Sequence, residues 1–388
     1  MSNKRKVIVA ITARPSYSRI RSAMAELRDN SGVELQVLCS GSALLHRYGR
    51  VVDLIRSDGF QIADELYTFV EGDELLNMAL TTSGTISQTA AVLRNTKPDC
   101  VVTVADRYET LGTAVAAAYL GIPLVHIQGG EITGNIDEKV RHAVTKLADM
   151  HLVATQGAAK RVRRMGETAS AVHITGCPSV DLAREASIMD RAVVQAALAE
   201  FGAGDRVNLE GDYIVVLQHP ETEAHDGSYN QMEIVLEAVR MFGIPAIVFW
   251  PNVDAGSDGT SKAIRVFREA GKGASFQFVK NLEGRLFLTL LKGARCLIGN
   301  SSVGIRECAY IGTPVVNIGQ RQSGRERANN VTDVAWDAAS ISAAIAKQLA
   351  IGRYKSSNLY GDGYAGQRIA NLIASAEIST NKRFSQHG

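Results

Sequence analysis

Cysteine is scarce in this sequence. The 388 residues include five cysteines, and none of them forms a CxxC pair. An odd number of scattered cysteines argues against a disulfide framework or a zinc site, and it favours reduced thiols in a cytosolic protein. Cys39 and Cys100 lie in apolar runs, so we expect them to be buried structural thiols.

Long apolar runs are missing as well. No segment approaches the ~20 consecutive apolar residues that a helix needs to span a bilayer, so no membrane partner is expected. The basic residues at the N-terminus precede only a short apolar run, which ends at Arg14-Pro15. This pattern favours a first β-strand over a signal peptide. The sequence therefore predicts a cytoplasmic protein.

Neither sign of charge dominates, and the common cofactor motifs are absent. Lys and Arg number 42 and Asp and Glu number 40, a net charge of +2 that argues against nucleic-acid binding. There is no HExxH, GxSxG or Walker A pattern and no metal-ligand spacing. The first strand is not followed by GxGxxG, which disfavours a dinucleotide site. We expect no metal, no cofactor and no nucleic-acid partner.

What the sequence does contain is a regular alternation of short apolar runs and helical patterns, which indicates parallel sheets. A first amphipathic helix is expected over residues 17–28. The predicted strands cover residues 6–11, 34–39, 100–104, 124–127, 151–154 and 173–175 in the first half, and 213–217, 246–249, 276–278, 296–298 and 315–318 in the second half. Two sets of strands in 388 residues predict an α/β protein with two Rossmann-like, doubly wound domains that face each other across a cleft. We place these domains at residues 1–178 and 179–365.

One local pattern occurs three times, as YLGIPLVHI, MFGIPAIVF and YIGTPVVNI. In each, a helix is expected to end at glycine, which tolerates the left-handed conformation of a helix C-cap. Proline then follows and opens a buried strand. The pattern therefore predicts one type of helix-to-strand joint, used once in the first half and twice in the second.

Charged residues follow two neighbouring strands of the first half. Asp106 and Arg107 end one apolar run, and Gln128-Gly129-Gly130-Glu131 ends the next. Ligands of open α/β sheets bind beyond the carboxyl ends of the strands. A carboxylate at the end of a buried strand is costly unless it is paired or used, and the two glycines permit close approach to a ligand. An internal Asp–Arg pair would also explain Asp106.

The helix that follows carries further charge. Asp137, Glu138, Arg141 and His142 share helical spacing in IDEKVRHAVTKLA. Asp137 and Arg141 are four residues apart, so a surface ion pair is the alternative to a catalytic role. Their nearness to Glu131 favours the catalytic role.

Arg14 lies at the end of the first strand, where a guanidinium can meet a diphosphate or a carboxylate. Ser16 or Ser18 is expected to cap the next helix. In the second half, His219 ends the strand YIVVLQ and is a candidate for general acid–base catalysis near neutral pH. Asn252, after the next strand, can supply a polar contact, or it belongs to a plain turn.

The stretch from Gly299 to Glu307, GNSSVGIRE, is the second strong motif. A strand ends at glycine, and a helix begins with Ser301, Ser302 and the backbone up to Gly304. Hydroxyl and N–H groups at a helix N-terminus can bind an anion. Simple capping by serine is the alternative. Glu307 can accept hydrogen bonds from ribose hydroxyls. Arg321, in the Gly-rich segment GQRQSGRE, favours phosphate binding.

Taken together, the stretches ARPSYS, ADRYET, HIQGGEITGNIDEKVRHAVTKLA, GCPS, LQHP, PNVDAGS, GNSSVGIRE, GTPVVNIGQRQSGRE and LYGDG resemble the UDP-N-acetylglucosamine 2-epimerase family, in particular its hydrolysing branch. They span nearly the whole chain in order. The resemblance implies the glycosyltransferase-B arrangement, UDP binding mainly by the second domain, and a final helix, residues 366–388 with their tail, that crosses back to the first domain. It also implies a homodimer or homotetramer.

The resemblance further implies a mechanism. A base removes the proton on sugar carbon 2 while UDP leaves carbon 1, and water adds to the 2-acetamidoglucal that results. Asp106, Glu131 and Asp137 would transfer protons, and His219 would act as an acid or stabilise the departing phosphate. Arg14, Arg19, Ser301 and Ser302 would stabilise the diphosphate, Glu307 would bind ribose, and Arg321 would contact uracil or phosphate. Asp106, Arg141 and His219 match catalytic positions of the family, while Arg107, Gln128, Asn252 and Gly304 would help to bind the UDP-sugar.

Gln128 departs from the family pattern, because several relatives carry a catalytic glutamate there. Glutamine cannot be the base, so Glu131 becomes the preferred carboxylate. Ala105-Asp106-Arg107 resembles members that act on UDP-2,4-diacetamido-2,4,6-trideoxyhexose in legionaminic acid synthesis. The expected function is hydrolysing 2-epimerisation of UDP-N-acetylglucosamine, which feeds sialic acid synthesis. The alternatives are the diacetamido substrate, a non-hydrolysing epimerase, a retaining glycosyltransferase and a non-catalytic UDP-sugar-binding protein.

Overall fold

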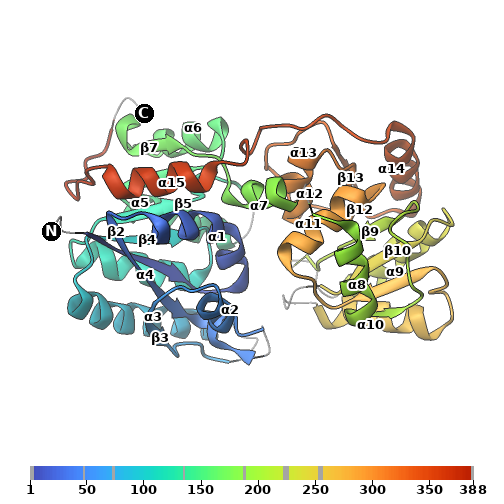
Figure 1. Ribbon diagram of the computed structural model, residues 1–388, viewed down its shortest axis with the longest axis horizontal. Coiled ribbons are helices and arrows are strands. Elements are labelled where there is room, and N and C mark those ends of the chain that lie inside the picture. The colour runs from blue at the N-terminus through green and yellow to red at the C-terminus, as the bar shows by residue number, and fades with distance from the viewer. Residues whose placement is uncertain are drawn as a thin grey trace. The chain divides into compact units, whose positions relative to one another are not determined.

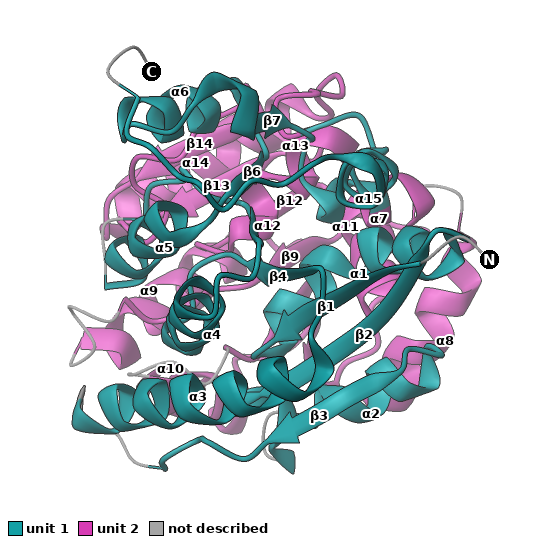
Figure 2. Ribbon diagram, turned by 90° about the vertical axis from the view of Figure 1, so that its left-hand side faces the viewer, with its two compact units in different colours: residues 1–181, 361–388 teal, residues 182–360 magenta. Residues whose placement is uncertain are grey.

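The computed structural model describes residues 4–46, 49–71, 75–133, 136–186, 189–221, 227–251 and 257–385. The chain divides into two compact units (Figure 2). Unit 1 comprises Met1–Asp181 together with Gly361–Gly388, and unit 2 comprises Leu182–Tyr360. Each unit has its own sheet and its own hydrophobic core.

Unit 1 is built on a seven-stranded parallel sheet with the order β3-β2-β1-β4-β5-β6-β7. Its strands are β1 (Arg5–Ile11), β2 (Val33–Ser40), β3 (Ile62–Leu66), β4 (Cys100–Val104), β5 (Leu124–Ile127), β6 (Met150–Val153) and β7 (Val172–Ile174). Its α-helices are α1 (Arg14–Asp29), α2 (Val51–Ser57), α3 (Leu75–Thr96), α4 (Tyr108–Tyr119), α5 (Ile136–Leu147), α6 (Gln156–Arg164), α7 (Pro178–Ala186) and α15 (Ala365–Ser375), where α7 continues into unit 2. The described part of unit 1 also contains the short 3-10 turns η1 (Gly41–Leu44) and η3 (Ala169–Ala171).

Unit 2 repeats this plan with the order β14-β13-β12-β9-β10-β11-β8, in which only β8 is antiparallel to its neighbour among the described pairs. Its strands are β8 (Gly202–Gly204), β9 (Ile214–Val216), β10 (Ala246–Phe249), β11 (Phe276–Val279), β12 (Cys296–Ile298), β13 (Val315–Ile318) and β14 (Val331–Val334). Its α-helices are α8 (Arg191–Phe201), α9 (Ser228–Arg240), α10 (Ser257–Glu269), α11 (Gly284–Gly293), α12 (Ser302–Ile305), α13 (Glu307–Ile311) and α14 (Ala338–Ile351). The predicted pair of doubly wound α/β halves is confirmed.

The central strands form because their sequences are apolar on both faces. Every residue of β4, β5 and β10 is buried, as expected for strands covered by helices on both sides. The three strands that the sequence did not reveal, β3, β8 and β14, lie at sheet edges and are partly exposed. An edge strand needs no apolar run, so its sequence gives no strong signal.

The repeated helix-to-strand joint has the predicted geometry. Gly121, Gly243 and Gly312 have φ values of 65°, 62° and 73° and thus the left-handed conformation. The buried strands β5, β10 and β13 follow within a few residues. The prediction of buried thiols is also confirmed, because Cys39 and Cys100 are buried and burial raises the pKa of Cys39 to about 12.

The C-terminal helix α15 packs against α1, although the two helices lie at opposite ends of the chain (Figure 1). Gly366 makes this close approach possible, because a Cβ there would lie 2.8 Å from the carbonyl carbon of Ser22. The buried carboxylate of Asp181 accepts hydrogen bonds from the backbone N–H groups of Ala365 and Gly366 and from the hydroxyl of Ser22. Asp181 therefore caps α15 and ties it to α1.

No helix among the described residues is long and apolar enough to cross a membrane.

Candidate active site

In unit 1 the strand order reverses between β1 and β4, which lie side by side. Residues beyond the carboxyl ends of such strands bind ligands in open α/β sheets. Arg14 begins α1 just beyond β1, and Asp106 follows β4. A cation at the N-terminus of a helix is unfavourable unless an anion lies nearby. This edge of the sheet therefore suits an anionic ligand.

Asp106 is held by arginine side chains. It forms an ion pair with Arg141 of α5, and its other carboxylate oxygen lies 4.0 Å from Nη1 of Arg19. Arg141 is 1% exposed, and its Nη1 donates a hydrogen bond to the carbonyl oxygen of Glu131 at 2.8 Å. One buried guanidinium thus connects the loops that follow β4 and β5. Because Arg141 is buried, the surface location that the alternative for Asp137 and Arg141 assumed is wrong for Arg141.

Arg107 lies next to a second buried carboxylate. Its Nε lies 3.3 Å from Oε2 of Glu109, which is fully buried. The charge of Glu109 raises the pKa of Arg107, and the charge of Asp137 adds to this effect. Gly41 packs against the same carboxylate, since a Cβ there would lie 2.9 Å from Oε1 of Glu109. Arg107 is therefore a permanent cation near the half-buried Asp137.

The segment Gln128–Glu131 passes tightly between helices. Gly129 lies against Thr145 of α5, and a Cβ on Gly130 would lie 2.5 Å from the carbonyl oxygen of Ala158 in α6. A side chain at Gly130 would clash with the backbone of α6, and one at Gly129 would crowd His126 and Thr145. The two glycines bring Glu131, which is 5% exposed, next to the guanidinium of Arg141.

Gln128 lies just before these glycines, has a φ of 66° and is 1% exposed. Its Nε2 donates a hydrogen bond to Sγ of Cys177 at 2.9 Å. Its Oε1 is buried and has no hydrogen-bond partner among the described residues. The amide is therefore anchored at one end, and its oxygen retains the capacity to accept a hydrogen bond.

Unit 2 has its own reversal of strand order, between β9 and β12. His219 follows β9, and Asn300 follows β12. The backbone N–H of His219 donates to Oδ1 of Asn300, and Nδ2 of Asn300 donates to the carbonyl oxygen of His219. Burial lowers the pKa of His219 well below its usual value, and the charge of Arg321 lowers it further. His219 is therefore a neutral imidazole at pH 7.

The GNSS motif lies at the same edge. Gly299 has a φ of 135°, and a Cβ there would lie 2.1 Å from the carbonyl oxygen of Leu217. Ser301 is the N-cap residue of α12, yet its hydroxyl makes no capping hydrogen bond within the described part of the chain. Ser302 accepts a hydrogen bond from Nη2 of Arg306. Capping therefore does not explain the serine at 301.

The helix interrupted at Arg306 continues as α13, whose first residue is Glu307, 7% exposed. Gly304 packs against β13, where a Cβ would lie 2.9 Å from Cγ1 of Val315.

The loop after β13 also reaches the end of β12. Nη1 of Arg321 donates to the carbonyl oxygen of Asn300 at 3.4 Å. A carboxylate oxygen of Glu221 accepts the backbone N–H groups of Gln320 and Arg321.

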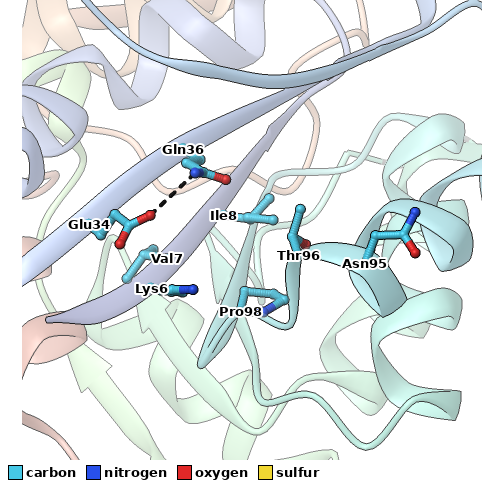
Figure 3. Close-up of a pocket in the computed structure, with 8 residues that line it drawn as sticks. All are labelled: Lys6, Val7, Ile8, Glu34, Gln36, Asn95, Thr96 and Pro98. Atoms are coloured by element: carbon cyan, nitrogen blue, oxygen red, sulfur yellow. Dashed lines mark hydrogen bonds between the residues drawn. The ribbon is translucent and has the colours of Figure 1, made fainter. Parts of the chain in front are cut away.

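Two described cavities are lined by none of the candidate site residues. One, of about 270 Å³, lies at the amino end of β1 and beside the end of α3 (Figure 3). Lys6, Glu34, Gln36 and Asn95 contribute to its lining, and Gln36 donates to Glu34. A second, of about 360 Å³, includes Gly319 and Arg327. We therefore identify the candidate site by its converging charged side chains.

The predicted site residues fall into two groups. Unit 1 carries Arg14, Arg19, Asp106, Arg107, Gln128, Glu131, Asp137 and Arg141, and unit 2 carries His219, Ser301, Ser302, Gly304, Glu307 and Arg321. Asn252 lies outside the described residues. Capping of α1 by Ser16 or Ser18 is wrong, because the helix begins at Arg14 and its N-cap is Ala13.

Sequence reasoning did not identify four residues that hold this site together. His126, Thr145 and Asn300 are fully buried polar side chains, and Arg161 of the KRVRR run donates from Nε to the carbonyl oxygen of Gly130. Only the apolar surroundings of His126 in LVHI offered a signal, since a buried polar group needs a partner.

Comparisons with known proteins add an independent finding. Residues 25–374 match the family model described as UDP-N-acetylglucosamine 2-epimerase. The chain is 30% identical over 369 residues to the UDP-N,N'-diacetylbacillosamine 2-epimerase (hydrolyzing) of Legionella pneumophila, with 95% of each chain covered. It is 27% identical to a UDP-N-acetylglucosamine 2-epimerase of Neisseria meningitidis serogroup B, with 98% of each chain covered.

Solved structures share the fold. The crystal structure of UDP-GlcNAc 2-epimerase from Neisseria meningitidis bound to UDP-GlcNAc has a TM-score of 0.78 at 17% identity, with 95% of this chain and 99% of that chain covered. The Methanocaldococcus jannaschii enzyme in complex with UDP-GlcNAc and UDP has a TM-score of 0.77 at 16% identity, with the same coverage. The predicted fold class, two Rossmann-like domains of the glycosyltransferase-B type, is thereby confirmed.

Proposed function

Because this chain belongs to the UDP-N-acetylglucosamine 2-epimerase family, we propose that it is a hydrolysing member of that family. The proposed reaction converts UDP-N-acetylglucosamine and water to N-acetylmannosamine and UDP. The observation that carries it is the arrangement of Asp106, Arg141 and Glu131 at the carboxyl ends of β4 and β5. Two carboxylates and a buried guanidinium there suit proton transfer next to a departing anion.

The reaction has two balanced steps. In the first, a carboxylate takes the proton from carbon 2, the C1–O bond breaks, UDP leaves with the bonding electrons, and a C1=C2 double bond forms. In the second, water gives its hydroxide to carbon 1 while carbon 2 receives a proton on the opposite face. The product is the free 2-epimer, and the protein needs only general acids and bases for these steps.

Several residues have proposed roles. Glu131 is the preferred base, since Gln128 has no carboxylate and Asp106 is paired with Arg141. Asp137 is a second proton-transfer carboxylate. Arg14, Arg19 and Arg107 supply positive charge for the diphosphate.

In unit 2, the hydroxyls of Ser301 and Ser302 and the backbone at Gly304 offer hydrogen bonds to phosphate, and Glu307 offers them to ribose. Arg321 contacts uracil or phosphate, and Asn252 adds a polar contact. We propose that the domains follow the two compact units, that the enzyme is cytoplasmic, and that it is a homodimer or homotetramer.

A second candidate substrate is the diacetamido sugar UDP-N,N'-diacetylbacillosamine. The Legionella pneumophila relative is named for that hydrolysing reaction, and so is a Campylobacter jejuni relative at 26% identity over 333 residues. The Ala105-Asp106-Arg107 sequence agrees with it. The Neisseria meningitidis serogroup B relative named UDP-N-acetylglucosamine 2-epimerase, at 27% identity, favours the N-acetylglucosamine substrate instead.

The test is NMR of the protein with each sugar nucleotide in deuterated water, with the Glu131→Gln variant as control. Release of UDP and of a free 2-epimer deuterated at carbon 2 is the expected result, with loss of turnover in the variant. A deuterated UDP-sugar epimer without free sugar would assign the non-hydrolysing reaction. Tight UDP binding with no turnover of either sugar nucleotide would assign a binding protein.

A further inference from the structure

His126 connects the two loops that carry the proposed catalytic groups of unit 1. The residue belongs to β5, opposite Thr103 of β4, and its side chain is fully buried. Its Nε2 lies 2.9 Å from the carbonyl oxygen of Ala105. Its Nδ1 lies 3.1 Å from Oγ1 of Thr145 on α5. A single ring therefore spans from the end of β4 to α5.

Both partners of His126 adjoin the Asp106–Arg141 ion pair. Ala105 directly precedes Asp106 and has a φ of 61°. The left-handed conformation costs a residue with a side chain about 1–2 kcal/mol, so it persists only where other contacts hold it. Thr145 lies one helical turn after Arg141, and its Oγ1 donates a hydrogen bond to the carbonyl oxygen of Arg141 at 2.9 Å. The hydrogen bonds of His126 thus act on the backbone of both ion-pair residues.

The proton positions follow from the partners. A carbonyl oxygen only accepts, so Nε2 of His126 carries the proton and donates to Ala105. Burial lowers the pKa of His126 to about 3, so the ring is neutral and its Nδ1 accepts. The hydroxyl of Thr145 has one proton and faces two acceptors, Nδ1 of His126 and the carbonyl oxygen of Arg141, so that proton is shared between them. Only the Nε2–H tautomer satisfies both contacts of the ring. Gly129 leaves room for this arrangement, since a Cβ there would lie 3.0 Å from both Nδ1 and Oγ1.

We propose that His126 and Thr145 are positioning residues. They hold Asp106 and Arg141 in the relative positions that the reaction requires, without touching the sugar nucleotide themselves. This inference rests on the proposed function, because it assigns a role at the same site. It predicts that the Thr145 hydroxyl matters for the chemical step and not for binding of the nucleotide.

The matched variants are Thr145→Val and Thr145→Ser. Valine keeps the shape of threonine but removes the hydroxyl proton that Nδ1 of His126 and the carbonyl oxygen of Arg141 share, whereas serine keeps it. We expect Thr145→Val to lower kcat at least tenfold, while KM and the calorimetric Kd of UDP change less than twofold. Thr145→Ser should stay within threefold of the wild type in kcat. Wild-type kcat in Thr145→Val, or equal losses in both variants, would overturn the proposal.

A second measurement does not depend on turnover or on a folded variant. In the wild-type protein with ¹⁵N-labelled histidine, NMR should show His126 as the neutral Nε2–H tautomer between pH 5.5 and pH 8. An Nδ1–H tautomer or an imidazolium at pH 7 would overturn the proposed hydrogen bonds. If the wild type turns over no UDP-sugar, the proposed function fails, and this spectrum still decides whether His126 connects Ala105 and Thr145.

Discussion

Asp106 and Arg141 form an ion pair inside unit 1, one from the loop after β4 and the other from α5. Arg141 is 1% exposed and also donates to the carbonyl oxygen of Glu131. The ion pair and this hydrogen bond therefore join the loop after β4, the loop after β5 and helix α5. Any loss of charge at Asp106 leaves a buried guanidinium without its carboxylate.

Asp106→Asn should therefore be destabilising as well as inactive. Removing one partner of a buried ion pair costs about 3 kcal/mol in the free energy of unfolding, because the other charge stays desolvated. Urea denaturation with a constant m-value measures this change. Asp29→Asn is the control, since Asp29 pairs with Arg28 on the surface and its loss should have no measurable effect. Equal midpoints for the two variants would contradict the buried-pair argument.

UDP should raise the pKa of His219. In the protein without ligand, burial and then the charge of Arg321 keep this pKa well below its usual value. A diphosphate near Arg321 adds negative charge that favours the imidazolium. NMR titration of the ring with and without UDP measures the shift. Arg321→Ala should raise the pKa in the absence of UDP, and an unchanged pKa in both experiments would place His219 and Arg321 outside the phosphate site.

Acid should lower the free energy of unfolding at pH values well above those at which carboxylates titrate. The pKa of His126 is about 3 in the folded protein, so the unfolded state binds more protons below pH 6.5. Stability is therefore complete above that pH and falls as the pH drops toward 3. His126 alone should lower the free energy of unfolding by about 2 kcal/mol between pH 6.5 and pH 5.

Two other buried groups of unit 1 act in the same direction. Burial lowers the pKa of His151. Burial alone would raise the pKa of Glu167, but hydrogen bonds from His151, Lys146 and Lys382 lower it to about 2. The stability that Glu167 contributes is therefore lost as the pH falls toward 2. Urea midpoints at pH 7 and pH 5 test the prediction, and a flat or rising stability on acidification would contradict it.

Gly366→Ala should loosen the C-terminal helix. The new methyl group would lie 2.8 Å from the backbone of Ser22, so α15 must move away from α1. Overpacking of this kind costs about 1–3 kcal/mol, which thermal or urea unfolding detects. Gly211→Ala is the matched control, because the nearest atom to a Cβ there is 3.7 Å away. Equal stability of the two variants would show that α15 adapts without cost.

The central strands could be predicted from sequence because burial on both faces leaves a continuous apolar run, as in β4 and β10. The joints at Gly121, Gly243 and Gly312 could be predicted because their backbone conformation restricts the residue type. The edge strands β3, β8 and β14 could not, since half-exposed strands accept polar residues. The start of α1 was misplaced because serine was assumed to cap it, whereas Arg14-Pro15 opens the helix after Ala13.

For the candidate site, sequence indicated which charged residues follow the strands, but it could not show how they pair. The partner of Asp106 comes from a distant helix, and the bond from Gln128 to Cys177 joins residues far apart in the chain. Supporting residues such as His126 and Asn300 have ordinary neighbours in sequence, and only the fold shows that both ends of their side chains are engaged.

The attachment of α15 to unit 1 has a consequence for how the chain is synthesised. Arg5, in the first strand, donates from Nη1 to the carbonyl oxygens of Ile373 and Ala376 near the end of α15. Asp181 receives its N–H partners only when Ala365 and Gly366 have been made. A ribosome delivers all of unit 2 before these residues emerge. The unit that begins the chain is therefore the last to be completed, and a prematurely terminated chain leaves the α15-binding side of α1 uncovered.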